Sequence, residues 1–220
     1  LKLAVPAVAA QVINMLYNIV DRIYIGHIPE VGDIALTGVG VTFPIIMLVS
    51  AFAAFAGQGG APLASIQLGA GNREKAEKIL GNSLTLLLIA AVALTVGFSV
   101  FKEPILYAFG ASENTIGYAM DYIGIYLIGT IFVQLALGLN TFISAQGKAL
   151  VAMLSVLIGA VLNICLDPVF IFGLHMGVKG AALATILSQA VSAAWVVGFL
   201  CSRRSGLRIR KQNMRLEPKV

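Results

Sequence analysis

Residues 149–173 read ALVAMLSVLIGAVLNICLDPVFIFG, and Asp167 is the only charged side chain among them. An apolar run of this length is long enough for an α-helix to cross the hydrocarbon core of a bilayer, which takes about 20 residues. Further runs of at least 18 mostly apolar residues cover 3–26, 34–57, 79–101, 116–139 and 178–201. The sequence therefore predicts an all-α, polytopic transmembrane helical bundle of six spans.

The composition excludes several other classes of protein. Of the 220 residues, 59% are apolar and only 11% are charged, which is more apolar side chain than a soluble domain of this size can bury. The apolar residues form continuous runs and do not alternate with polar ones, so the pattern excludes a transmembrane β-barrel. Two cysteines are too few for a disulfide framework.

The basic residues are distributed unevenly between the two sides of the predicted bundle. Because successive spans alternate in direction, the connectors fall into two sets, and one set holds only Lys102 and Lys179. The set that includes both termini holds Lys2, Arg73, Lys75, Lys78, Lys148, Arg203, Arg204, Arg208, Arg210, Lys211, Arg215 and Lys219. The positive-inside rule then predicts that both termini are cytoplasmic. The net charge of +5 follows from this topology, so we expect no nucleic-acid partner.

After the last span, residues 202–220 are rich in Lys and Arg. We expect residues 1–201 to form one six-helix unit and residues 202–220 to form a basic cytoplasmic loop. The loop is either solvated or in contact with anionic lipid.

Three of the predicted spans carry polar residues along one helical face. An intramembrane charge costs about 2.5 to 3.5 kcal/mol on insertion scales, so each such residue marks a candidate functional site. In the first span the polar face consists of Gln11, Asn14, Asn18 and Asp21, which are three or four residues apart. In the fifth span it consists of Ser155, Gly159, Asn163 and Asp167, and in the sixth of Thr185 and Gln189.

Four of these polar residues are expected at a similar depth. At 1.5 Å per residue, their distances from the cytoplasmic ends of their spans are about 21 to 27 Å. They are Asp21, Asn163, Asp167 and Thr185. Their oxygen atoms suit a small hard cation such as Na⁺, or one proton shared between the two acids. Other interpretations are an interfacial Asp21–Arg22 pair, a helix break at Asp167–Pro168 and a structural role for Thr185.

Signatures of catalysis are missing from the sequence. His27 and His175 stand without the Cys or acidic spacing of a metal site, and no Ser–His–Asp set falls at one depth. The segment from Gly69 to Glu74 lacks the third glycine of a dinucleotide loop. We therefore expect neither an enzyme nor a cofactor.

The polar residues and several glycine-rich segments together resemble the multidrug and toxic compound extrusion (MATE) transporters. The matching residues are Pro6, Gln11, Asn14, Tyr17, 21–26, 69–72, Gly159, Asn163, Asp167, Pro168 and 177–185. This family consists of secondary antiporters with twelve helices in two lobes. The resemblance corresponds to the amino-terminal lobe and implies a missing carboxyl-terminal lobe as partner, to which residues 202–220 would lead.

The resemblance also implies a function and roles for individual residues. The protein would reside in the cell membrane and export organic cations or amphiphilic drugs in exchange for H⁺ or Na⁺ by alternating access. The coupling site, which is also the possible Na⁺ site, would consist of Asp21, Asn163, Asp167 and Thr185. The substrate cleft would include Asn14, Tyr17 and Asn140, and Pro6 would bend the first helix, unless it is only an early kink.

Two alternatives to a drug antiporter remain open. A flippase for lipid-linked oligosaccharides shares the architecture of the lobe, but its cleft should carry several cationic residues for a pyrophosphate. Here Arg22 is the only basic residue within a span. A non-transporting membrane scaffold or intramembrane enzyme would need an apolar interior or a catalytic pair, and the polar cluster fits neither.

Overall fold

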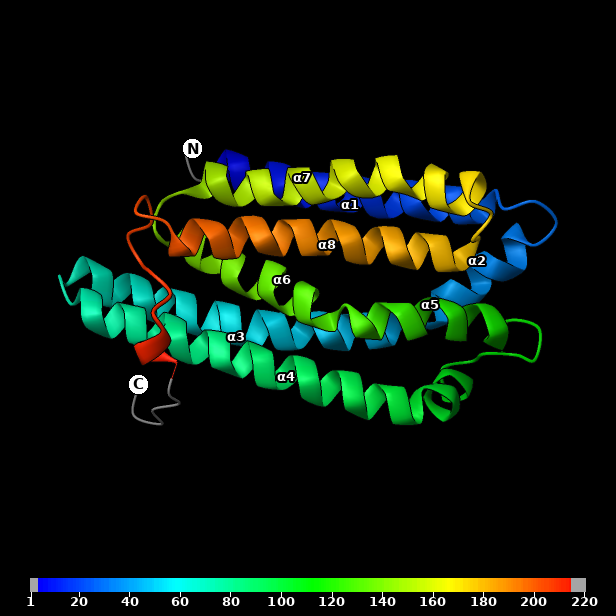
Figure 1. The fold of residues 1–220 in the computed structure, drawn as a ribbon, viewed down its shortest axis with the longest axis horizontal. Helices are drawn as coiled ribbons and strands as arrows, with labels where there is room; N and C mark the ends of the chain where they lie inside the picture. The colour runs from blue at the N-terminus through cyan, green and yellow to red at the C-terminus, as the bar shows by residue number, and fades with distance from the viewer. Residues whose placement is uncertain (1–3, 215–220) are drawn as a thin grey trace.

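The structure is a computed structural model that describes residues 4–214, and within that range it is helical without strands. The long helices lie side by side, and successive connectors lie at opposite ends of the bundle (Figure 1). The elements are α1 (Ala4–Gly26), α2 (Gly32–Val41), α3 (Phe43–Gly69), α4 (Arg73–Ala108), α5 (Ile116–Ile128), α6 (Thr130–Ala145), α7 (Ala149–Pro168), η1 (Val169–Gly173), α8 (Val178–Cys201) and η2 (Lys211–Asn213).

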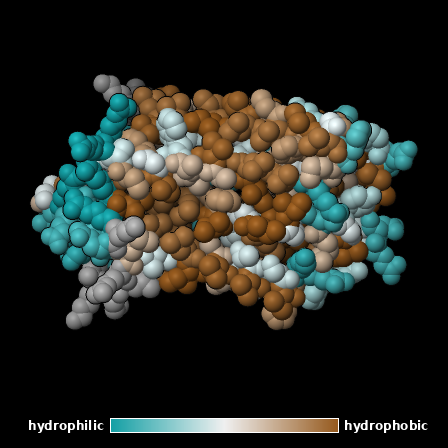
Figure 2. Space-filling view, in the orientation of Figure 1, coloured by the Kyte–Doolittle hydropathy of each residue, from teal (hydrophilic) through white to brown (hydrophobic). Residues whose placement is uncertain are grey.

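The predicted bundle of transmembrane helices is confirmed. Five of the described helices are long and apolar enough to cross a membrane, and a sixth span results if α5 and α6 are counted together. The predicted spans 149–173 and 178–201 coincide with α7 plus η1 and with α8. On the face that Figure 2 shows, apolar side chains form a band between two hydrophilic ends. Large apolar side chains within the helices, such as Phe55, Ile128 and Met15, are 79%, 75% and 69% exposed, as expected for contact with lipid.

The fourth predicted span, 116–139, is not a straight helix. It consists of α5 and α6, which meet at Gly129 with a bend of 59° and continue to Ala145. A Cβ atom at Gly129 would lie 2.5 Å from a side-chain carbon of Ile186, so the glycine lets α8 pack closely against the bend.

The second predicted span, 34–57, is interrupted near its middle, and its helix continues past residue 57, as the Ala-, Gly- and Leu-rich residues 59–71 predict. The helix is interrupted at Thr42, where Pro44 enters the first turn of α3, because proline has no N–H to continue the hydrogen bonds of α2. From there α3 runs on to Gly69. Gly57 does not end it, because this glycine is a packing contact: a Cβ atom there would lie 2.6 Å from the carbonyl oxygen of Gly138.

Up to Met214, the tail after α8 is partly packed against the bundle rather than fully solvated. Leu207 is fully buried in the apolar core between α3, α4, α6 and α8. The Oε1 atom of Gln146 accepts hydrogen bonds from Ser205 Oγ at 3.0 Å, Gly206 N at 2.8 Å and Leu207 N at 3.2 Å. The tail therefore packs against the bundle through Ser205, Gly206 and Leu207, while Arg203, Arg204 and Arg210 stay exposed.

An ion-paired glutamate fastens the tail to α4. The side chain of Glu77 is only 4% exposed, and its two carboxylate oxygens accept Arg73 Nε at 3.1 Å and Arg210 Nε at 2.9 Å. The described basic connectors and the start of α1 all lie at this end of the bundle (Figure 1). The cytoplasmic placement of this end stays a prediction, and Lys2, Arg215 and Lys219 lie outside the described residues.

Candidate functional site

The site begins with a hydrogen-bonded triad between α7 and α8. Asn163 Nδ2 donates to Asp167 Oδ1 at 3.2 Å and to Thr185 Oγ1 at 3.5 Å. Asn163 and Asp167 are one helical turn apart, and both are buried. The helices come close because Gly159 faces α8 without a side chain: a Cβ atom there would lie 2.4 Å from Ser192 Oγ. The sequence placed these groups at one depth, and the structure brings them into contact.

Asp21 completes the cluster from α1. Its side chain is buried, and its carboxyl group interacts with that of Asp167 across the α1–α7 contact. The interpretation of Asp21 and Arg22 as an interfacial ion pair is wrong. The Arg22 guanidinium instead lies over the ring of Phe43, 5.2 Å from its centroid. The four residues expected at one depth therefore form one cluster.

The interpretation of Asp167–Pro168 as a helix break is also wrong. Helix α7 continues through Pro168 into the π-helical turn η1, in which Leu174 N donates to Val169 O at 2.8 Å. Proline removes one backbone donor, and the chain responds by changing its hydrogen-bond register rather than by ending. Turns of this kind inside helices are frequent at functional sites.

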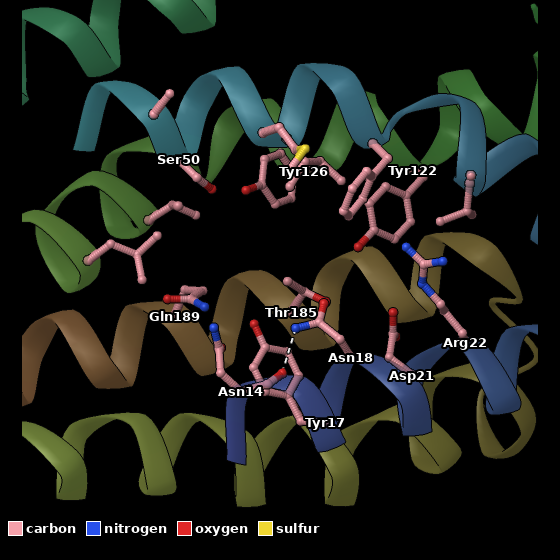
Figure 3. A pocket seen from close by; sticks show the side chains of 18 of the residues that line it. Asn14, Tyr17, Asn18, Asp21, Arg22, Ser50, Tyr122, Tyr126, Thr185 and Gln189 are labelled. Atoms are coloured by element: carbon pink, nitrogen blue, oxygen red, sulfur yellow. Dashed lines mark hydrogen bonds between the residues drawn. The ribbon is translucent and has the colours of Figure 1, made fainter. Parts of the chain in front are cut away.

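A cleft of about 590 Å³ lies beside the cluster, between α1, α2, α3, α5, α6 and α8. Its polar lining consists of Asn14, Tyr17, Asn18, Asp21, Arg22, Ser50, Tyr122, Tyr126, Thr185 and Gln189 (Figure 3). The Asp21 carboxyl and the Tyr122 hydroxyl point into it from opposite walls. Val39, Phe43 and Met47 make much of the remaining lining apolar. Such a surface suits an amphiphilic ligand with a positive charge.

The predicted cleft residues do not all line the cleft. Asn14 and Tyr17 line it, as expected from the resemblance, and also line a smaller pocket of about 40 Å³ between α1, α6, α7 and α8. Asn140 lines only this smaller pocket. Its amide is engaged there, because Nδ2 donates to Ala152 O at 3.3 Å and Oδ1 accepts Ser155 Oγ at 3.1 Å.

Pro6 is buried at the third described residue of α1. In an α-helix the backbone N–H of residue 6 would donate to the carbonyl oxygen of residue 2, and proline has no such N–H. Residue 2 lies outside the described residues. Bending of α1 at Pro6 therefore stays a prediction.

Two aromatic residues of the cleft were not among the residues expected to line it. The rings of Tyr122 and Tyr126 on α5 are stacked, with centroids 6.3 Å apart and planes at 15°. They lie four residues apart in a span where Tyr118 continues the same period. This spacing indicates that the tyrosines share one face of the helix. Tyrosine is also common at membrane interfaces, so the sequence alone does not place the pair in a cleft.

The cluster has unsatisfied oxygen atoms that a cation could use. Asp21 Oδ1, Asn163 Oδ1 and Asp167 Oδ2 are buried and lack a hydrogen-bond partner within residues 4–214. Together with the hydroxyl of Thr185 they offer the oxygen set that Na⁺ favours, while the same acids can take up H⁺. Among the described residues no group of three or more His, Cys, Asp or Glu side chains is placed to hold a metal ion.

Comparison with known proteins gives consistent matches. A family model described as MatE matches residues 6–169. The multidrug export protein MepA of Staphylococcus haemolyticus (strain JCSC1435) is 29% identical over 204 residues, which are 93% of this chain and 45% of MepA. A probable multidrug resistance protein, NorM of Thermotoga maritima, is 29% identical over 216 residues, which are 96% of this chain and 46% of NorM.

The same similarity holds at the level of structure. A crystal structure of a MATE protein in the bent conformation matches with a TM-score of 0.91 at 29% identity, over 99% of this chain and 48% of that protein. The chain thus spans about half the length of the relatives that it matches.

Proposed function

Because this chain belongs to the MatE family of membrane transporters, we propose that it forms the amino-terminal lobe of a cation-coupled drug antiporter. The transporter exports organic cations or amphiphilic drugs in exchange for H⁺ or Na⁺. The chain is a multi-pass protein of the cell membrane and not an enzyme. A second six-helix lobe, the partner in this proposal, faces the cleft from the other side and allows access to alternate.

The observation that carries the proposal is the position of Asp21. This carboxyl group belongs to the buried acid cluster and also lines the cleft. In a medium of low dielectric constant, a proton or Na⁺ bound at the cluster and a cationic drug beside Asp21 compete for the same negative charge. Binding of one therefore weakens binding of the other by the same factor, which is the coupling that an exchanger requires.

The cleft also supports the proposed class of substrate. The faces of Tyr17, Tyr122 and Tyr126 offer cation–π contacts, and the apolar residues of α2 and α3 accommodate hydrocarbon groups. Arg22 is the single basic residue of the lining, which disfavours a pyrophosphate-linked substrate of the flippase class.

The test is efflux of ethidium from vesicles that contain the complete transporter, with a pH gradient and a Na⁺ gradient imposed separately. We expect one of the two gradients to drive efflux in the wild type and neither to drive it after Asp21→Asn. Asp121→Asn is the matched control, because Asp121 is half-exposed and pairs with Lys179 at 3.3 Å, away from the cleft. Unimpaired gradient-driven efflux in the Asp21 variant would contradict the proposal.

A further inference from the structure

The small pocket beside the cleft borders the proposed coupling site at Asn163 and Thr185, and the proposed exchange leaves its space without a role. Its volume is about 40 Å³, and it lies between α1, α6, α7 and α8. Its polar lining consists of Asn14, Tyr17, Asn140, Ser155, Asn163, Thr185, Ser188, Gln189 and Ser192. Below, this space is called the side pocket.

Two buried polar atoms of the side pocket lack a protein partner. Ser188 Oγ and Asn163 Oδ1 are both inaccessible to solvent and accept or donate no hydrogen bond within residues 4–214. Ser188 and Asn163 are 3% and 2% exposed. A buried polar group without a partner costs about 1 to 3 kcal/mol, so such groups in folded proteins are normally satisfied by bound water.

The size of the side pocket suits water and excludes drugs. A water molecule needs about 10 to 15 Å³ of such space, so the side pocket has room for about three or four. The pocket is also lined by hydroxyl and amide groups, in contrast to the apolar cavities that stay dry. We propose that the side pocket binds ordered water molecules that connect the cleft with the Asn163–Asp167 pair, and so give the coupling ion a path that the drug does not share.

The connectivity of the two spaces supports such a path. Asn14, Tyr17, Thr185 and Gln189 line both the cleft and the side pocket, so the two adjoin along these residues. Asp167 lines neither space and is fully buried. Asp167 is therefore linked to the side pocket through the hydrogen bond that it accepts from Asn163. The Oδ1 atom of Asn163 has no protein partner within the described residues and is free to bind water.

The opposite end of the side pocket is closed. Asn140 and Ser155 both donate to Ala152 O, at 3.3 and 2.8 Å. Beyond them Ala152, Val196 and Leu200 belong to the apolar core. Water can thus enter from the cleft but cannot pass through to the basic end of the bundle, so the side pocket is a branch of the cleft and not a second channel across the membrane.

Silver ions test for this water directly. Ag⁺ is a small monovalent cation that reacts with thiols that water reaches, whereas thiols buried among apolar side chains are inert. The test uses the complete protein with Cys165 and Cys201 replaced by serine, since both are exposed. Ser188→Cys is compared with Ala181→Cys, a fully buried position in the apolar core of the same helix.

We expect Ag⁺ adducts, measured as the intact mass, for the Ser188→Cys protein and none for the Ala181→Cys protein. Equal reaction of both proteins, reaction of neither, or reaction at position 181 alone would overturn the proposal.

A second pair of variants tests the function of the water. Ser188→Val fills the pocket, so we expect gradient-driven efflux to slow about tenfold at unchanged drug affinity. Val191→Ile is the matched control, because Val191 is exposed on the same helix and lines neither space, and it should leave efflux unchanged. Normal efflux by a folded Ser188→Val protein would contradict the path.

This inference rests on the proposed antiport, and the outcomes separate the two. If the wild type shows no gradient-driven efflux while Ser188→Cys binds Ag⁺, the antiport fails and the hydrated pocket stands. If the wild type transports and Ser188→Cys is inert, only the water path fails.

Discussion

Two sets of buried carboxylates lie in different parts of this bundle and are treated in opposite ways. At the basic end, Glu77 is held by Arg73 and Arg210, and each carboxylate oxygen has its own guanidinium partner. In the other half, Asp21 and Asp167 face each other, and each keeps one oxygen without a partner within the described part of the chain.

The contrast separates a structural charge from a functional one. A buried charge costs several kcal/mol unless it is paired, and the Glu77 pairs remove that cost permanently. In the proposed antiport, the two aspartates remove this cost only when a proton or cation is bound. Their energy therefore depends on the state of the site, and this dependence is what a coupled transporter needs. Burial alone does not distinguish the two cases, but the partners do.

The largest effect is expected from the aspartate pair. Asp167→Asn keeps the shape of the side chain and its contact with Asn163 but removes a titratable, cation-binding group. We expect gradient-driven efflux to fall by about 100-fold or more, since a transfer step needs this group. The thermal midpoint should be unchanged or higher, because a buried charge is lost. Asp121→Asn again serves as control. If Asp167→Asn strongly lowered the thermal midpoint of unfolding but left efflux intact, Asp167 would have a structural role like that of Glu77.

A smaller effect is expected from separating the tail from α4. In Gly81→Ala the new Cβ atom would lie 2.0 Å from the carbonyl oxygen of Asn213, so the tail must shift. We expect the free energy of unfolding to fall by about 1 to 3 kcal/mol, as for other overpacked sites.

Limited proteolysis should then cut the tail faster after Gly81→Ala. Gly97→Ala in the same helix has open space around it and should be neutral or slightly stabilising. Equal stability of the two variants would mean that the tail does not dock as described.

The smallest effect is expected from Glu77→Gln. It removes both ion pairs, but Arg73 and Arg210 are half-exposed and can be solvated, so we expect a loss of about 1 kcal/mol. Efflux per folded molecule should be retained. The control is Glu74→Gln. Glu74 pairs with Lys78, but the Glu74 side chain is highly exposed, so this ion pair should contribute almost nothing to the free energy of unfolding. Abolished efflux in folded Glu77→Gln protein would give Glu77 a role in transport and remove the contrast with the aspartates.

Sequence reasoning was most successful where the physical rule is local. The spans 149–173 and 178–201 follow from uninterrupted apolar runs, and the polar faces follow from helical period, so the meeting of Asn163 with Thr185 could be anticipated from depth. The bend between α5 and α6 could not. Gly129 packs closely against Ile186 of α8, and nothing near Gly129 in the sequence says which helix lies opposite.

The docked tail and the placement of Asn140 depend on contacts between distant residues. Gln146 binds the backbone of residues that follow some 60 positions later, and Glu77 pairs with Arg210 across most of the chain. A basic segment looks the same in the sequence whether it is solvated or held in this way. The same holds for the aromatic pair in the cleft. In the sequence, Tyr122 and Tyr126 are equally compatible with a position at the membrane interface, and only the structure stacks them in the cleft.

By itself the sequence determined that the chain spans a membrane as helices, which of its residues are polar within the spans, and on which helical face they lie. These properties depend only on run length and on the 3.6-residue period. The tertiary structure decided which of the buried acids are paired and which keep free oxygens, and where small polar pockets remain. Those outcomes depend on how closely helices approach, which is set by contacts between residues far apart in the chain.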